Sequence, residues 1–296
     1  MHYRGSKKTL YILAIIVILL PRYCFATALT GTSKSTKEDS VAITGVSFSG
    51  GGALGFCYIG VLDVLDSFGI KIDCITGSSI GSLIAVLYAN GYTAREILGI
   101  LKEEHIDNLC HIYRPNLYFS GGLVDTRHLQ RILAKYLKHN SFDSLQIKFY
   151  CCVTDMNTNK PHYISTGGNL VQYVIASLAV PGIFAPVMID SIYYFDGGTN
   201  DMLPVAPLFK ENCTRRIGVF PIMEKEKNIE QPNFLWIRAY THIYYMQILR
   251  NKDAFTDIIA IDPINYGVLS FKKMSELTDI GRKVTWQYLH QEKRIN

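Results

Sequence analysis

The stretch IDCITGSSIGSLIAVLY, residues 72–88, contains a strand signal, a turn signal and a helix signal in direct succession. Residues Ile72 to Thr76 are apolar with a β-branched bias, which predicts a short buried strand. Residues Ile80 to Tyr88 form an apolar run that predicts a helix, and Asn90-Gly91 ends it. The glycine-flanked segment between them therefore predicts a sharp turn from a strand into a helix.

This turn has the Gly-x-Ser-x-Gly pattern, with Ser79 at its centre. Ser78 precedes it, but only Ser79 has glycine two residues to either side, at Gly77 and Gly81. Such a turn projects a hydroxyl, and the following helix N-terminus favours developing negative charge. The bare pattern arises by chance roughly 0.1 times in a chain of this length. Its position between a strand and a helix is what predicts a nucleophilic serine.

A second strand-to-helix turn lies one strand earlier in the chain. A strand is expected over 41–48, and a helix with apolar positions at steps of three and four is expected from Ala53 to Phe68. Three consecutive glycines separate them, and glycines at a helix start expose N–H groups that suit an oxyanion or a phosphate. The predicted N–H donors are Gly50, Gly51, Gly52 and Ala53.

The same glycines allow a different interpretation, because Gly50, Gly52 and Gly55 also fit the dinucleotide-binding pattern. That pattern needs an acidic residue at the end of the next strand to bind a ribose. Asp73 stands at the beginning of that strand instead, and the strand ends in the serine turn. The oxyanion interpretation is therefore favoured, and no cofactor is predicted.

Asp196-Gly197-Gly198 forms a third turn, after a strand expected at Tyr193 to Phe195. Asp-Gly alone is an ordinary turn sequence. Because the same chain also contains the other two turns, this turn predicts that Asp196 acts with Ser79. A carboxylate at its usual pKa of about 3.9 is a poor base for a serine hydroxyl, so we expect the apolar residues before Asp196 to bury it and raise its pKa.

The remaining chain alternates strand and helix signals. Strands are expected at 147–154, 162–165, 217–220 and 258–261, and helices at about 94–104, 126–137, 171–178, 234–250 and 278–291. Thr93 and Glu96 form a capping box at the first of these helices. This alternation predicts an α/β fold, a three-layer sandwich with a mostly parallel central sheet and helices on both faces.

The first 28 residues differ in character from the rest. Basic residues precede an apolar run from Leu10 to Leu20, which is shorter than the roughly 18 residues needed to span a bilayer. Ala26-Thr27-Ala28 matches a cleavage site, so residues 1–28 are predicted to be a signal peptide, with an uncleaved anchor as the alternative. Residues 29–40 are expected to be a flexible leader and 41–296 a single domain. A secreted or cell-envelope protein is the resulting expectation.

Charge and cysteine content exclude several classes of function. Residues 1–26 hold four basic and no acidic residues, so the formal net charge of +5 becomes +1 without them. No basic stripe remains, and nucleic-acid binding is not expected. None of the seven cysteines has C-x-x-C spacing, so no cysteine metal site is predicted, and no other metal site is expected. Only Cys110 and Cys213 are candidates for pairing.

The chain resembles the patatin-like phospholipase family over nearly all of residues 41–285. The resemblance rests on the first two turns and on ASLAVPGIFAP at 176–186 and YFDGGTNDMLP at 194–204. It implies a Ser-Asp dyad, with Ser79 as nucleophile, Asp196 as proton acceptor and the glycine-loop N–H groups as oxyanion donors. Leu54 stands where many members carry Arg or Lys, so that charge does not contribute to phosphate binding here.

These observations predict a lipid acyl hydrolase that cleaves phospholipid or other glycerolipid esters, without a cofactor, at a membrane surface. A neutral-lipid or soluble-ester esterase, and a catalytically silent lipid-binding protein, are the alternatives. The presence of both Ser79 and Asp196 disfavours the silent form. A Ser-Asp-His triad with His242 is a further alternative, although His242 lies in an aromatic helical run where a packing role is more common. That run, 234–245, is expected either to meet a membrane or to pack in the core.

Overall fold

The computed structural model describes residues 42–107, 126–223, 235–263 and 265–295. They belong to one compact unit, Val41–Asn296. The predicted signal peptide and leader lie outside the described residues. None of the helices in the described ranges is long and apolar enough to cross a membrane.

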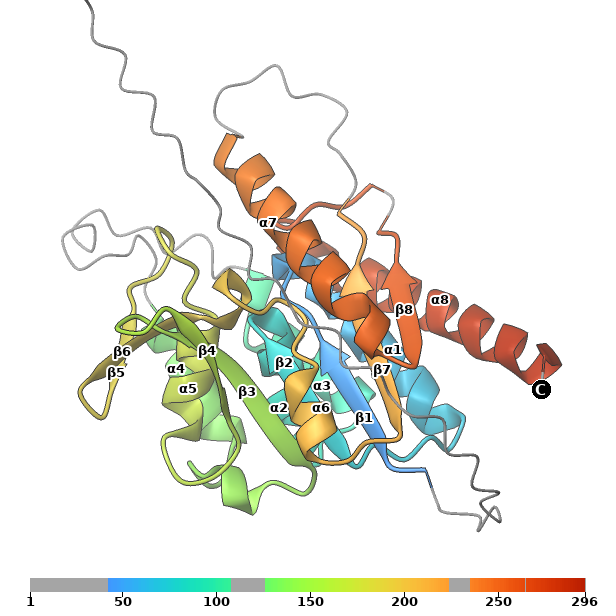
Figure 1. Ribbon diagram of the computed structural model, residues 1–296, viewed down its shortest axis with the longest axis horizontal. Helices are drawn as coiled ribbons and strands as arrows, with labels where there is room; N and C mark the ends of the chain where they lie inside the picture. Colours follow the sequence, from blue (N-terminus) through green and yellow to red (C-terminus); the bar gives the residue numbers. More distant parts are fainter. Residues whose placement is uncertain (1–41, 108–125, 224–234, 264, 296) are drawn as a thin grey trace, which may run out of the picture. The chain divides into compact units, whose positions relative to one another are not determined.

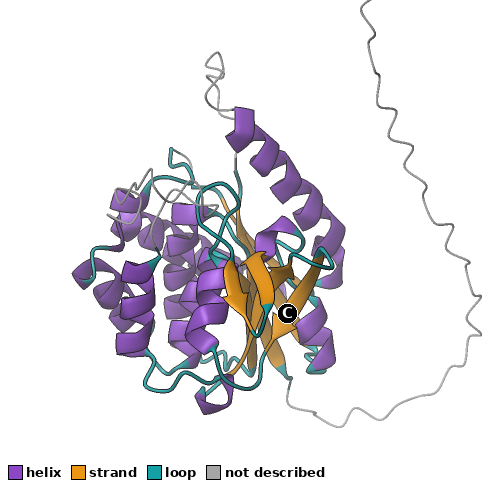
Figure 2. Ribbon diagram, turned by 90° about the vertical axis from the view of Figure 1, so that its left-hand side faces the viewer, coloured by secondary structure: helices purple, strands orange, loops and turns teal. Residues whose placement is uncertain are grey.

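The described residues form an eight-stranded mixed sheet in the order β5-β6-β3-β2-β1-β7-β8, with β4 paired to β3 (Figure 1). The pairs β3-β2, β2-β1, β1-β7 and β7-β8 are parallel, whereas β4 and β6 run antiparallel to β3. Helices lie on both sides of the sheet (Figure 2), which confirms the predicted three-layer α/β architecture. The strands are β1 Thr44–Phe48, β2 Cys74–Ser78, β3 Lys148–Asp155, β4 Lys160–Ile164, β5 Val187–Ile189, β6 Ile192–Asp196, β7 Arg215–Pro221 and β8 Asp257–Ile261.

Each predicted helix is present, with its ends shifted by a few residues. The helices are α1 Cys57–Ser67, α2 Ile80–Ala89, α3 Ala94–Glu103, α4 Arg127–Tyr136, α5 Leu170–Ser177, α6 Ala206–Lys210, α7 Leu235–Asn251 and α8 Met274–Ile295. The helix expected from Ala53 begins as a 3-10 turn, η1 Gly52–Phe56, and continues as α1. The capping box of α3 is confirmed, since Thr93 Oγ1 accepts from the N–H of Glu96 and Thr93 N–H donates to Glu96.

The central strands are buried on both faces, as covered parallel strands usually are. Val46, Phe48 and Ile75 are fully buried. The described cysteines are free, buried thiols that pack as small hydrophobic groups: Cys57, Cys74, Cys151, Cys152 and Cys213. Cys213 is therefore not paired, and Cys110 lies outside the described residues.

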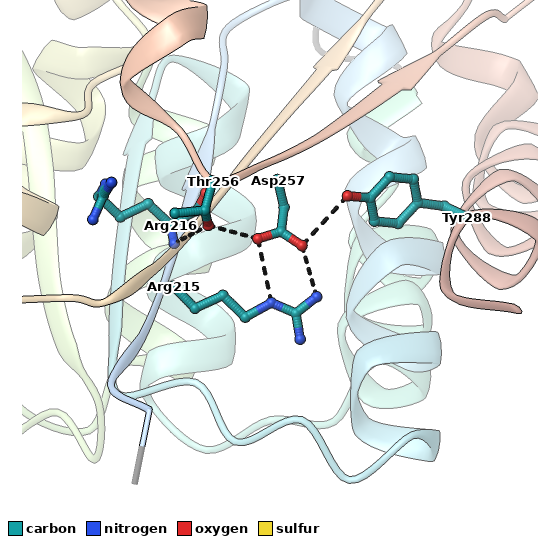
Figure 3. A network of polar contacts seen from close by, with 5 residues as sticks. All are labelled: Arg215, Arg216, Thr256, Asp257 and Tyr288. Carbon is teal, nitrogen blue, oxygen red and sulfur yellow. Dashed lines mark hydrogen bonds and ion pairs between the residues drawn. The ribbon is translucent and has the colours of Figure 1, made fainter. Parts of the chain in front are cut away.

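A polar network ties the amino ends of β7 and β8 to α8 (Figure 3). Arg215 donates to Asp257 through Nη2 at 2.7 Å and through Nε at 3.4 Å. Thr256 Oγ1 donates to the second oxygen of Asp257 at 2.6 Å, and Tyr288 of α8 donates to the first at 3.3 Å. This network fixes the edge of the sheet opposite to the serine turn.

Candidate active site

Ser79 occupies the turn between β2 and α2 with a strained backbone. Its φ is 52° and its ψ is −127°, a conformation that side-chain-bearing residues adopt mainly at functional sites. A Cβ on Gly77 would lie 2.5 Å from the carbonyl of Gly81, and a Cβ on Gly81 would lie 2.6 Å from the carbonyl oxygen of Ser49. The N–H of Ser79 donates to Ser177 Oγ at 3.0 Å. The close packing therefore requires both glycines and holds Ser79 at the carboxyl end of β2.

Asp196 ends β6 and is 1% exposed. Its Oδ1 accepts from the N–H of Gly198 at 2.6 Å. Its Oδ2 is buried and has no well-aligned hydrogen-bond donor in the described part of the chain. Burial raises the pKa of Asp196 to about 7, while the Ser79 hydroxyl and the Gly198 N–H act in the opposite direction. The Ser79 hydroxyl thus interacts with this carboxyl without an aligned hydrogen bond, as is common for catalytic pairs before substrate binds.

The register of β3 brings the two residues together. Ser78 pairs with Cys152 of β3, and Asp196 pairs with the next residue, Val153. Strand β4 pairs with one edge of β3 over residues 151–155, so β2 and β6, which pair with parts of the same range, must both lie on the other edge. There β2 pairs with residues 148–152 and β6 with residues 153–155, one after the other. The carboxyl ends of β2 and β6 therefore meet, and each presents its turn at the same point.

The glycine loop lies against the same point. A Cβ on Gly50 would lie 3.3 Å from the Cβ of Ser79. The N–H of Gly50 donates to Met202 O at 3.2 Å, and the N–H of Ala53 donates to Val268 O at 2.9 Å. Two of the four predicted oxyanion donors are therefore already engaged. Gly51 and Gly52, with φ of 142° and 57°, have N–H groups for which the described residues supply no acceptor.

A cluster of buried hydroxyl groups supports the glycine loop. Ser49 Oγ donates to Gly50 O at 2.7 Å and lies 2.8 Å from the hydroxyl of Tyr58 and 3.1 Å from that of Tyr244. Tyr244, on α7, also donates to Pro221 O at 2.9 Å. These contacts connect the loop after β1 to the end of β7 and to α7.

Helix α7 also holds the segment that follows Asp196. Gln247 Oε1 accepts from the N–H of Met202 at 2.6 Å, and Gln247 Nε2 donates to Thr199 O at 3.0 Å. Asn251 Nδ2 donates to Asp201 Oδ1 at 2.8 Å. Since Met202 O accepts from the glycine loop, one helix positions both the Asp196 loop and the glycine loop.

Asp201 is a second buried carboxylate nearby, but its surroundings differ from those of Asp196. Tyr163 donates to Asp201 Oδ2 at 2.6 Å, while Asn251 donates to Oδ1. Both oxygens of Asp201 are thus bonded, whereas Asp196 keeps one oxygen available beside Ser79. Burial is the largest cause that raises the pKa of Asp201. Of the two carboxylates, Asp196 is thus the one with an oxygen that the described residues leave without a donor.

The other predicted residues take supporting places. A Cβ on Gly55 would lie 2.3 Å from Ile80, and one on Gly197 would lie 2.2 Å from Cys152 O, so both glycines permit close packing. Leu54 is buried and brings no charge to the site. His242 is exposed on α7.

Asp73 does not serve a dinucleotide. It binds Lys71 at 2.6 Å and accepts from the N–H of Thr44 at 3.0 Å. Both contacts lie at the amino edge of the sheet, away from the glycine loop, so the ribose-binding acid of the alternative interpretation is missing from its expected position.

Several contributors were not predicted from the sequence, among them Ser177, Met202 and Gln247. Ser177 and Met202 lie inside two of the stretches that carried the resemblance, which was the available signal. Gln247 had none, because its role depends on how α7 packs. Together the site combines a serine hydroxyl, a carboxylate with a pKa of about 7 and available N–H groups, the components of acyl transfer.

Comparisons with known proteins identify the family of this chain. Residues 46–209 match the family described as patatin-like phospholipase. The chain is 28% identical over 177 residues to the lysophospholipase NTE1 of Scheffersomyces stipitis, covering 59% of this chain and 11% of that protein. It is 30% identical to NTE1 of Candida glabrata over 59% of this chain and 10% of that protein. This chain therefore spans about a tenth of the length of these curated relatives.

A solved structure shows the same fold. The crystal structure of VipD from Legionella pneumophila superposes with a TM-score of 0.53 at 14% identity, over 84% of this chain and 67% of that one. At this identity the likeness concerns the fold alone. The family match covers more than half of the chain, including all three turns. The chain belongs to the patatin-like phospholipase family.

Proposed function

We propose that this chain is a lipid acyl hydrolase that cleaves phospholipid or other glycerolipid esters through an acyl-Ser79 intermediate. The observation that carries the proposal is the buried Oδ2 of Asp196 beside Ser79, which has no aligned donor among the described residues, on a carboxyl whose pKa is raised to about 7. A base with a pKa near the working pH is the most effective. The names of the relatives, lysophospholipases, support a lipid ester as the substrate.

In the first half of the proposed reaction, Asp196 takes the proton of Ser79 while Ser79 Oγ attacks the ester carbonyl carbon. The N–H groups of Gly51 and Gly52 donate to the oxyanion that forms, since the described residues leave these groups without another acceptor. The carbon–oxygen bond to the alcohol then breaks. Protonated Asp196 returns its proton to the leaving alcohol oxygen, and the acyl group stays on Ser79.

In the second half, Asp196 takes a proton from water and the water oxygen attacks the acyl-serine carbonyl. The same N–H groups hold the second oxyanion. The bond to Ser79 Oγ breaks, and Asp196 returns the proton to that oxygen. The fatty acid leaves and the free dyad is restored.

The test compares hydrolysis of labelled phospholipid, triacylglycerol and a short-chain soluble ester by the wild type, Ser79→Ala and Asp196→Asn. Both variants should lose activity by about 10⁴-fold. Ser78→Ala is the matched control, because the Ser78 hydroxyl is buried without a hydrogen bond to any described residue, and it should retain activity. Equal release by the wild type and both dyad variants would contradict the proposal.

The substrate panel separates the proposed function from its nearest alternative. The buried, uncharged Leu54 favours a neutral-lipid or soluble-ester substrate over one recognised by its phosphate. Preference for triacylglycerol or the soluble ester would establish that narrower activity on the same dyad.

We also propose export, supported by the basic, apolar and small-residue succession in residues 1–28. Expression of the full chain should release a product whose first residue is Leu29. N-terminal sequencing of the cell-free fraction measures this. A cell-bound protein that still begins with Met1 would show that the segment is not cleaved and acts as an anchor.

A further inference from the structure

Helix α7 has an exposed apolar face formed by Ile243, Met246 and Leu249, here called the outer face. These side chains are 47%, 56% and 52% exposed. Their spacing of three residues places them on one side of the helix. Single exposed apolar residues are ordinary, but a contiguous group marks a surface that binds something.

The other side of α7 connects this face to the catalytic machinery. Tyr244, Gln247 and Asn251 point inward and bond to the glycine loop and to the segment after Asp196. The outer face is therefore carried by the same rigid helix that positions both halves of the site. A partner bound to the outer face therefore contacts the helix that positions both turns of the site.

The charge of α7 indicates the chemistry of that partner. Helix α7 contains Arg238 and Arg250 and no acidic residue, and Lys252 follows it in a short 3-10 turn that also contains Asp253. Arg250 and Lys252 are exposed. A helix with an apolar face and only basic charges is typical of peptides that lie in the interface of an anionic lipid surface.

The size of the face argues against a second protein molecule. Stable protein complexes bury about 800 Å² on each partner, and the three half-exposed side chains that the structure describes on this face offer far less. A lipid surface needs no such area or shape match, because each apolar side chain enters the acyl boundary independently.

We infer that the outer face of α7 binds anionic lipid surfaces, with Ile243, Met246 and Leu249 entering the acyl boundary and Lys252 contacting anionic head groups. This inference rests on the proposed function, because lipid binding by the outer face matters for catalysis only if the dyad cleaves lipid esters. Binding itself does not require catalysis and is measured separately.

The experiment uses the full chain in a Ser79→Ala background, so that vesicles stay intact. Binding to phosphatidylcholine vesicles, with and without phosphatidylglycerol, is measured by cosedimentation for the triple variant Ile243→Gln, Met246→Gln, Leu249→Gln. The triple variant should bind at least about tenfold more weakly, because three apolar contributions are removed. Lys252→Gln should lose about fivefold, and only on the anionic vesicles.

The matched control is Phe209→Gln with Trp286→Gln, which replaces two side chains that are each 51% exposed on other elements. It should bind vesicles like the parent. With Ser79 restored, the triple variant should hydrolyse p-nitrophenyl butyrate at the wild-type rate, which shows an intact fold and site.

Unchanged vesicle binding by the triple variant overturns the inference. So does a shift from dimer to monomer in analytical ultracentrifugation with unchanged vesicle binding, which would make the outer face a contact between copies. If the wild type cleaves no ester, the proposed function fails, yet the Ser79→Ala binding series still decides the outer face.

Discussion

At the amino ends of β7 and β8, each oxygen of Asp257 has a donor, from Arg215 and Thr256 (Figure 3). At the carboxyl end of β6, Asp196 Oδ2 has no aligned donor among the described residues, and the neighbouring Ser79 has a strained backbone. A buried carboxylate oxygen without a donor is costly. We therefore expect the carboxyl ends of β2 and β6 to lower the stability of the protein, and the core and the amino ends of the strands to supply it.

The largest expected effect is on activity at the carboxyl edge. Asp196→Asn should reduce kcat by about 10⁴-fold, because the amide cannot accept the serine proton. In the wild type, kcat/KM should rise with pH with an apparent pKa of about 7, as Asp196 loses its proton. A profile that is flat between pH 5 and 9 would contradict the assignment of Asp196 as base.

The same variant should be more stable than the wild type at high pH. Burial raises the pKa of Asp196 from 3.8 to about 7, so the native state binds a proton that the unfolded state releases between these values. Stability of the wild type therefore falls as pH rises through 7. Thermal denaturation at pH 8 should show Asp196→Asn melting higher by on the order of 5 °C, and the difference should shrink toward pH 4. A constant difference would contradict the comparison.

At the amino edge the expected signs are reversed. Arg215→Met should lower the free energy of unfolding by about 2 kcal/mol, since it removes the guanidinium that bonds to the buried Asp257. Activity per folded molecule at 25 °C should not change. Urea denaturation and active-site titration measure the two quantities. Lys71→Met is the matched control, because its ion pair with Asp73 is at the same edge but exposed, and it should cost under about 0.5 kcal/mol.

The connection between α7 and the site should give a smaller effect on kcat. Gln247→Met leaves the N–H of Met202 and the carbonyl of Thr199 without their partner, and we expect about a tenfold lower kcat with little change in KM. Gln247→Glu keeps the acceptor for Met202 and should recover part of the loss. Steady-state kinetics on a soluble ester measure both effects. Equal kcat in all three proteins would show that α7 does not position the site through Gln247.

The smallest effect is expected for His242→Ala. His242 is exposed on α7, so kcat should stay within about twofold of the wild type. Loss of activity with an unchanged circular dichroism spectrum would establish a triad and would move the catalytic base away from Asp196.

The turns were predictable because each needs particular residue types at adjacent positions. Ser79 between two glycines and Asp196 before two glycines are local patterns, and the long strands and helices show local periodicity. Two elements were not predicted, β5 Val187–Ile189 and α6 Ala206–Lys210. They are too short for a periodic pattern, and β5 exists because it pairs with β6.

The sequence by itself determined the chemical groups of the site, the alternation of strands and helices and the position of each turn at a strand end. Only the tertiary structure decided that β2 and β6 meet along one edge of β3, and that Asp196 is buried there with one oxygen lacking a donor in the described part of the chain. It also decided that the N–H groups of Gly50 and Ala53 donate to the carbonyl oxygens of Met202 and Val268. These outcomes depend on contacts between segments far apart in the chain, whose packing and hydrogen bonding no local pattern specifies.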